Sequence, residues 1–131
     1  MNKKKQIWYR YNNDTKKLKT ECVDLLSKCY LMLGQKPDTQ QVVLMSQLLY
    51  DDLINNYSRF TMQEVIFAFE QAIKHSDNGN FVNVRNWNIW LKEYKEKARI
   101  KRQQNLLTDY QQHEKNIKLI GKTINKAKHL K

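Results

Sequence analysis

The residues that break helices and close tight turns are almost missing from this sequence, which has one proline and three glycines in 131 residues. A β-rich fold of this length needs many tight turns, and these two residues supply most of them. Apolar residues instead recur at steps of three and four, the spacing that puts them on one face of an α-helix. The sequence therefore predicts an all-α fold.

Helix-capping patterns divide the first part of the chain. An apolar stripe over 20–33 ends at Gly34, which suits a left-handed helix end. Asp38 is the expected cap of a second helix, which is apolar on more than one side and is the best candidate for a central helix. Thr61 and Glu64 have capping-box spacing and open a third helix.

The last part of the chain reads as a fourth helix from about Val84 to Ala98, after which the apolar stripe lapses. It resumes as heptads, so the sequence allows either two helices or one long helix with a stutter. The heptad residues are Leu106, Tyr110, His113, Ile117, Ile120, Ile124 and Ala127. We expect a compact bundle of three to four helices over 20–98, packed around Leu26, Leu48, Leu49, Ile66, Phe69 and Trp87. Trp90 belongs either to that core or to the surface.

Positive charge is concentrated at the two ends of the chain, whose net charge is +11. Residues 1–20 contribute +6 and residues 92–131 contribute +8, whereas residues 21–91 contribute −3. Such segregation favours a polyanionic partner. We therefore expect a basic aromatic arm (1–19), a helical domain (20–98) and a basic helical extension (99–131) whose heptads suit a coiled coil.

Both basic segments contain residue types that bind nucleic acid. Aromatic rings next to cations can stack on unpaired bases while the cations neutralise phosphate; alternatively, Trp8 folds back onto the core and anchors the arm. A basic helix can lie along a phosphate backbone without reading bases, and the cations from Arg99 onward have no evident acidic partner in the sequence. The candidate binding residues are Lys3, Lys4, Lys5, Trp8, Tyr9, Arg10, Tyr11, Lys16, Lys17, Lys95, Arg99, Lys101 and Arg102.

Catalysis and cofactor binding have no motif to support them. Asp51 and Asp52 are adjacent, so on a helix they point about 100° apart and read as solvated surface acids rather than a catalytic pair. Histidines and cysteines lack a metal-ligand spacing, and Cys22 and Cys29 read as reduced core thiols. We expect no enzyme activity, no metal and no cofactor.

Three features follow one another between residues 22 and 95. They are a Leu-rich segment ending in Asp-Asp-Leu (43–53), an aromatic-plus-capping turn that opens a helix (60–65, with Ala68 and Ile73), and a loop phenylalanine before the last helix (Phe81). In this order of features the chain resembles the small helical replisome organiser or helicase loader/inhibitor proteins of phages. The family's proline-containing step after the loop is replaced by Phe81-Val82-Asn83. The resemblance implies a helical module whose C-terminal segment contacts a replicative helicase, and it brings no catalytic residues.

Together these features predict a nucleic-acid-associated accessory protein with low sequence specificity, of the phage replication type. The alternative is an interaction adaptor that dimerises or docks on an acidic protein through Leu106, Tyr110, Ile117, Ile120 and Ile124. No stretch approaches the roughly 18 apolar residues of a membrane span. We therefore expect a cytoplasmic location without a membrane partner, in the host cytoplasm if a phage encodes the chain.

Overall fold

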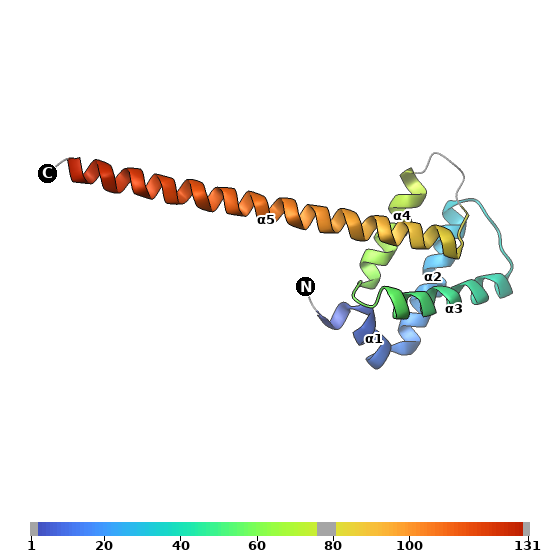
Figure 1. Ribbon diagram of the computed structural model, residues 1–131. Helices are drawn as coiled ribbons and strands as arrows, with labels where there is room; N and C mark the ends of the chain where they lie inside the picture. Colours follow the sequence, from blue (N-terminus) through green and yellow to red (C-terminus); the bar gives the residue numbers. More distant parts are fainter. Residues whose placement is uncertain (1–2, 76–80, 130–131) are drawn as a thin grey trace. The chain divides into compact units, whose positions relative to one another are not determined.

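A computed structural model describes the backbone of residues 3–75 and 81–129 and the side chains of residues 4–75 and 81–118. Within these ranges the chain forms helices and no β-strand, so the all-α prediction is confirmed. The elements are the 3-10 turn η1 (Lys3–Lys5) and the helices α1 (Ile7–Asn13), α2 (Thr15–Met32), α3 (Thr39–Asn56), α4 (Met62–His75) and α5 (Val84–His129) (Figure 1). No helix in the described part of the chain is both long and apolar enough to cross a membrane.

The chain divides into two compact units, Met1–Glu93 (unit 1) and Tyr94–Lys131 (unit 2). Residues 1–19, expected as a separate arm, belong to unit 1, and the boundary expected near residue 98 falls at Glu93. A single helix, α5, runs through this boundary. Of the two alternatives left by the lapse in the apolar stripe, one long helix is the one that forms.

The short helix α1 is held by the loop that precedes α4. The backbone N–H of Ile7 donates to the carbonyl of Phe60 at 2.8 Å, and that of Trp8 donates to Ser58 at 2.9 Å. First-turn N–H groups have no acceptor inside their own helix, and Gln6 supplies no side-chain cap. The loop carbonyls take that role, while the side chain of Ile7 is fully buried.

The central helix of unit 1 is α2, which packs against α1, α3 and α4. It begins at Thr15, five residues before the predicted start, because the buried Leu18 extends its apolar stripe toward the N-terminus. The prediction that α3 is central was wrong. Leu48 was expected in the core, but its side chain is 49% exposed on α3 beside the exposed Leu44. The breadth of the apolar run on α3 thus reflects an outer apolar surface rather than burial on two sides.

The core of unit 1 otherwise contains the predicted residues. Leu26, Leu49, Phe69 and Trp87 are fully buried, and Ile66 is half-buried. Trp90 also belongs to this core, at 7% exposure, with its ring edge-on to Phe69 at a centroid distance of 5.2 Å. The first turns of α5 are therefore fixed on α4 by aromatic contacts.

The predicted helix ends have the expected geometry. Gly34 has a φ of +70°, the left-handed conformation that favours glycine. The Asp38 carboxylate accepts from the Gln41 N–H at 2.7 Å. At α4 the Glu64 N–H donates to Thr61 Oγ1 at 3.1 Å, and the Thr61 N–H donates to Glu64 Oε1 at 3.0 Å. The capping box is thus reciprocal, and it fixes where α4 begins.

Cys22 and Cys29 are fully buried free thiols on the inward face of α2. Burial raises the pKa of each thiol to about 12, and the nearby Glu21 and Glu70 carboxylates, respectively, act in the same direction. At neutral pH both side chains are uncharged and pack as small apolar groups.

Candidate nucleic-acid interface

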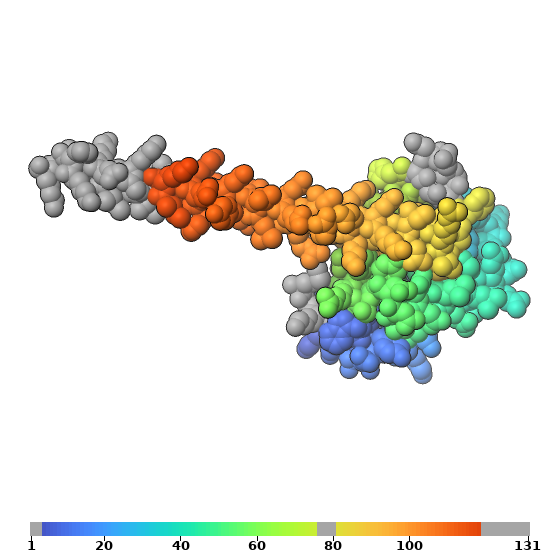
Figure 2. Space-filling view, viewed as in Figure 1, coloured from blue at the N-terminus to red at the C-terminus, as the bar shows by residue number. Residues whose placement is uncertain are grey.

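The first basic surface of interest lies on α5 in unit 2. Every side chain from Arg99 to Lys118 is exposed, as are Lys95 and Lys97. In the space-filling view of Figure 2 this segment is coloured orange. Among the described residues, no hydrogen bond or ion pair is made by Lys95, Lys97, Lys101 or Arg102. These charges are free to meet an external anion.

Arg99 differs from its neighbours, because its guanidinium binds the Glu96 carboxylate, with Nη2 and Oε1 2.6 Å apart. This hydrogen bond raises the pKa of Arg99 and lowers that of Glu96. The expectation that Arg99 has no acidic partner was therefore wrong. Both side chains are exposed, and such surface pairs contribute little stability, so the pair does not bury the charge.

The helical positions of α5 place two kinds of side chain on one face in succession. Lys95, Arg99 and Arg102 are separated by four and three residues and share a face. The same face continues through Leu106, Tyr110, His113 and Ile117, whose side chains are exposed. A cationic stretch about 10 Å long at a rise of about 1.5 Å per residue is thus followed by an apolar stretch.

The second basic surface lies in unit 1 on η1 and the start of α2. Lys4, Lys5, Lys16 and Lys17 are exposed there. Arg10 is less accessible than these lysines, because its guanidinium forms ion pairs with Glu21 and Asp14 and its side chain is only 14% exposed. Arg10 therefore links α1 to α2, and its role as a nucleic-acid contact stays a prediction.

The aromatic residues of α1 remain partly accessible. Trp8 and Tyr11 are 39% and 44% exposed. The Trp8 indole donates to Gln6 Oε1 at 2.6 Å, and the Tyr11 ring lies 6.4 Å from that of Tyr50, centroid to centroid. Ile7, rather than Trp8, anchors the segment, so the alternative in which Trp8 folds into the core was wrong.

The side chains of three candidate residues lie outside the described ones. These are Lys3, expected to bind nucleic acid, and Ile120 and Ile124, expected to contribute to oligomerisation.

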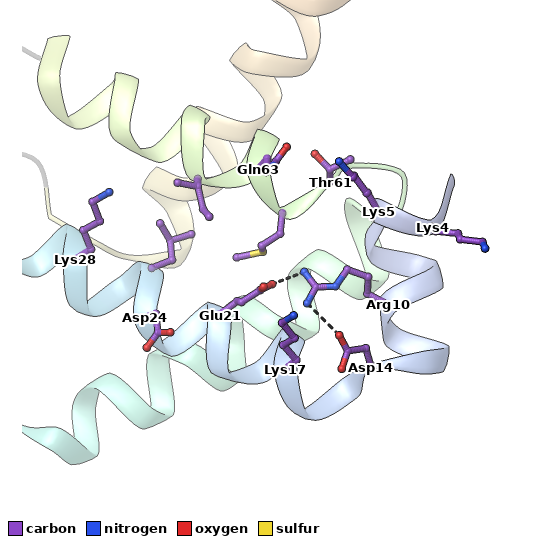
Figure 3. A pocket seen from close by; sticks show the side chains of 13 residues that line it. Lys4, Lys5, Arg10, Asp14, Lys17, Glu21, Asp24, Lys28, Thr61 and Gln63 are labelled. Atoms are coloured by element: carbon purple, nitrogen blue, oxygen red, sulfur yellow. Dashed lines mark hydrogen bonds and ion pairs between the residues drawn. The ribbon is translucent and has the colours of Figure 1, made fainter. Parts of the chain in front are cut away.

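A pocket of about 570 Å³ opens in unit 1 between η1, α1, α2 and the start of α4 (Figure 3). Its apolar side chains are Leu25, Met62 and Ile66, and its charged and polar lining consists of Lys4, Lys5, Arg10, Asp14, Lys17, Glu21, Asp24, Lys28, Thr61 and Gln63. Sequence reasoning found three of its lysines and missed the pocket. The capping box marks the start of α4, but no local signal reports that this start lies beside α2.

No three His, Cys, Asp or Glu side chains of the described residues lie close enough together to hold a metal ion. No family model matches the chain, and neither the curated proteins nor the solved structures contain a significant match.

Proposed function

We propose that this chain is a non-enzymatic, nucleic-acid-associated accessory protein that binds the phosphate backbone with low sequence specificity. The observation that carries the proposal is the cationic stretch of α5. Within 95–102 there are five basic residues and one acidic residue, and four of the five cations have no partner among the described residues. A polyanion with closely spaced charges is the ligand that such a stretch fits best.

Counterion release supplies the binding free energy in this account. Each Lys or Arg that neutralises a phosphate releases condensed cations from the nucleic acid, which makes affinity steeply dependent on salt. Lysines and arginines that contact only phosphate carry no sequence information. The described part of unit 1 adds a second set of exposed lysines, Lys4, Lys5, Lys16 and Lys17. The mildly acidic part, residues 21–91, is expected to make no contact with the phosphate backbone.

The resemblance of 43–53 and 60–65 to phage replisome organisers and helicase loaders gives the proposal a biological setting. We propose a role in phage DNA replication within the host cytoplasm, with a replicative helicase as a protein partner. In this setting a helical module, flanked by a basic N-terminal segment and a basic C-terminal helix, brings the helicase and the nucleic acid together.

Titration of the full chain with single-stranded and double-stranded oligonucleotides at rising salt tests the proposal. The expected result is binding at low salt to both, with an affinity that falls linearly on a log–log plot against salt concentration. If neither oligonucleotide binds the chain at about 50 mM salt, the proposed function is contradicted.

A second candidate function rests on the apolar half of the α5 face. Leu106, Tyr110 and Ile117 are 67%, 62% and 55% exposed at heptad spacing, as in helices that pair with another helix. This favours an adaptor that dimerises or docks through α5. Sedimentation of the full chain with Leu106→Gln and Ile117→Gln, compared with Leu107→Gln, tests it. Loss of a dimer in the first variant alone supports the adaptor, and a dimer that survives both excludes this face.

A further inference from the structure

We propose that the pocket of unit 1 binds one nucleotide of a single-stranded nucleic acid, with guanine as the preferred base. The inference rests on the proposed function and extends it by naming the ligand and its site. A volume of about 570 Å³ lies within the roughly 300–1,000 Å³ of small-ligand sites.

The apolar part of the pocket suits one face of a base. Leu25, Met62 and Ile66 line it, and of these the half-buried Ile66 exposes the most surface. Extruded bases are held between aromatic or apolar side chains, which exclude water from the two faces of the ring. The exposed rings of Trp8 and Tyr11 do not line the pocket, so they are not needed for this contact.

The cations at this end of the pocket outnumber the acids, because Lys5, Lys17 and Arg10 stand against Asp14 and Glu21. Arg10 forms ion pairs with both Asp14 and Glu21, as the dashed lines in Figure 3 show. Lys5 and Lys17 are exposed and make no ion pair. Two ammonium groups thus remain at this side of the pocket for a phosphate, which lysine binds as a point charge.

Asp24 supplies the selectivity. Lys28, four residues later on α2, pairs with Glu70 instead, and Asp24 makes no hydrogen bond or ion pair although it lines the pocket. A carboxylate accepts hydrogen bonds and donates none. The Watson–Crick edge of guanine offers two adjacent N–H donors, which a carboxylate can accept together, and the other three bases lack this pair.

The arrangement of these groups matches the length of a nucleotide. Lys17 and Asp24 are seven residues apart on α2, which corresponds to about 10 Å along the helix. In Figure 3 Lys5 and Asp24 lie at opposite ends of the pocket. A phosphate at the lysine end and a base edge at the Asp24 end span this distance.

Methyl NMR on the full chain labelled at Met, Leu and Ile methyl groups tests the inference. The probes are the four deoxynucleoside monophosphates, orthophosphate, and a short peptide of alternating aspartate and leucine. We expect dGMP to shift the Met62 and Ile66 methyl signals saturably, while Met45, which does not line the pocket, stays unchanged. Lys5→Gln with Lys17→Gln weakens binding of every nucleotide, whereas Asp24→Asn removes a guanine preference of at least about fivefold. Lys36→Gln with Lys74→Gln is the charge-matched control.

The other outcomes contradict the inference in distinguishable ways. Equal shifts with orthophosphate mean that the pocket binds a simple anion, and stronger shifts with the acidic peptide mean that its ligand is a protein. If no nucleotide shifts Met62 but oligonucleotides still bind the chain, the pocket inference fails and the proposed function stands. If oligonucleotides also fail to bind at low salt, the proposed function fails as well.

Discussion

The indole Nε1 of Trp87 donates a hydrogen bond to Asp52 Oδ2 at 2.8 Å, joining α5 to α3 inside unit 1. The same oxygen accepts from Asn88 Nδ2 at 2.8 Å, and Oδ1 accepts from Asn56 Nδ2 at 2.8 Å. The expectation that Asp52 is a solvated surface acid was therefore wrong. Its carboxylate satisfies a buried tryptophan and orients the first turn of α5.

Removing this carboxylate is expected to destabilise the chain. Asp52→Ala leaves the buried Trp87 N–H without its acceptor, and an unsatisfied buried donor costs about 1–3 kcal/mol. Urea unfolding followed by tryptophan fluorescence measures the change in the free energy of unfolding. The neighbouring Asp51 is exposed, so Asp51→Ala is the matched control and should lie within about 0.5 kcal/mol of the natural chain. Equal changes in the free energy of unfolding for the two variants would mean that the hydrogen bond does not contribute to stability.

The capping box at the start of α4 predicts a second stability effect. Thr61→Ala removes the hydroxyl that accepts from the Glu64 N–H, and the loss of such a cap costs about 0.5–2 kcal/mol. Gln63→Ala, at an exposed position of the same first turn, should leave the free energy of unfolding nearly unchanged. A Thr61→Ala chain as stable as the Gln63→Ala chain would show that the loop, not the cap, fixes the helix start.

The burial of Ile7 predicts that the N-terminal segment is part of the cooperative fold. Because this side chain is fully buried, Ile7→Ala should destabilise unit 1 by about 2–5 kcal/mol. Asn12→Ala, at an exposed position of α1, serves as the control. If thermal unfolding of the Ile7→Ala chain matches that of the control, α1 does not contribute to the fold.

The buried thiols predict a loss of stability in alkali. Folding raises the pKa of Cys22 and Cys29 from 9.0 to about 12. Between these pH values the unfolded chain has released thiol protons that the folded chain retains, so stability falls as pH rises, by at most roughly 1.4 kcal/mol per pH unit for each thiol. Unfolding titrations from pH 8 to 11 measure the slope. A chain with Cys22→Ala and Cys29→Ala should show a shallower slope, and identical slopes would contradict the burial of these thiols.

The parts of the fold that sequence patterns predicted correctly are those governed by local chemistry. Gly34, Asp38 and the Thr61–Glu64 pair act within one helical turn, so spacing alone identifies them. Errors arose where tertiary contacts decide. Leu48 and Leu49 are adjacent leucines in the apolar run of α3, yet only Leu49 is buried. Which of them faces α2 depends on the direction from which α2 approaches, and the sequence of α3 does not contain that information.

The candidate site shows the same contrast between features set by the local sequence and features set by tertiary contacts. The exposed lysines on α5 were predictable from charge density, and every side chain over 99–118 is exposed. The role of Arg10 was not predictable, because its partner Glu21 is eleven residues away across a helix junction. Asp24 gave no signal either, since its place in the pocket depends on the long-range contact of α2 with α4.

The salt dependence of nucleic-acid binding by matched variants tests the central claim most directly. One variant replaces Lys95, Lys97, Lys101 and Arg102 by Gln, and its control combines Lys36→Gln, Lys74→Gln, Arg59→Gln and Arg85→Gln, which removes the same charge from exposed positions in residues 21–91. The account predicts that the α5 variant loses affinity for duplex DNA and that its log–log salt slope falls by about 0.9 per lost phosphate contact. The control should keep the affinity and the salt slope of the natural chain. Equal losses in the two variants would show that only net charge matters, and would contradict an interface on α5.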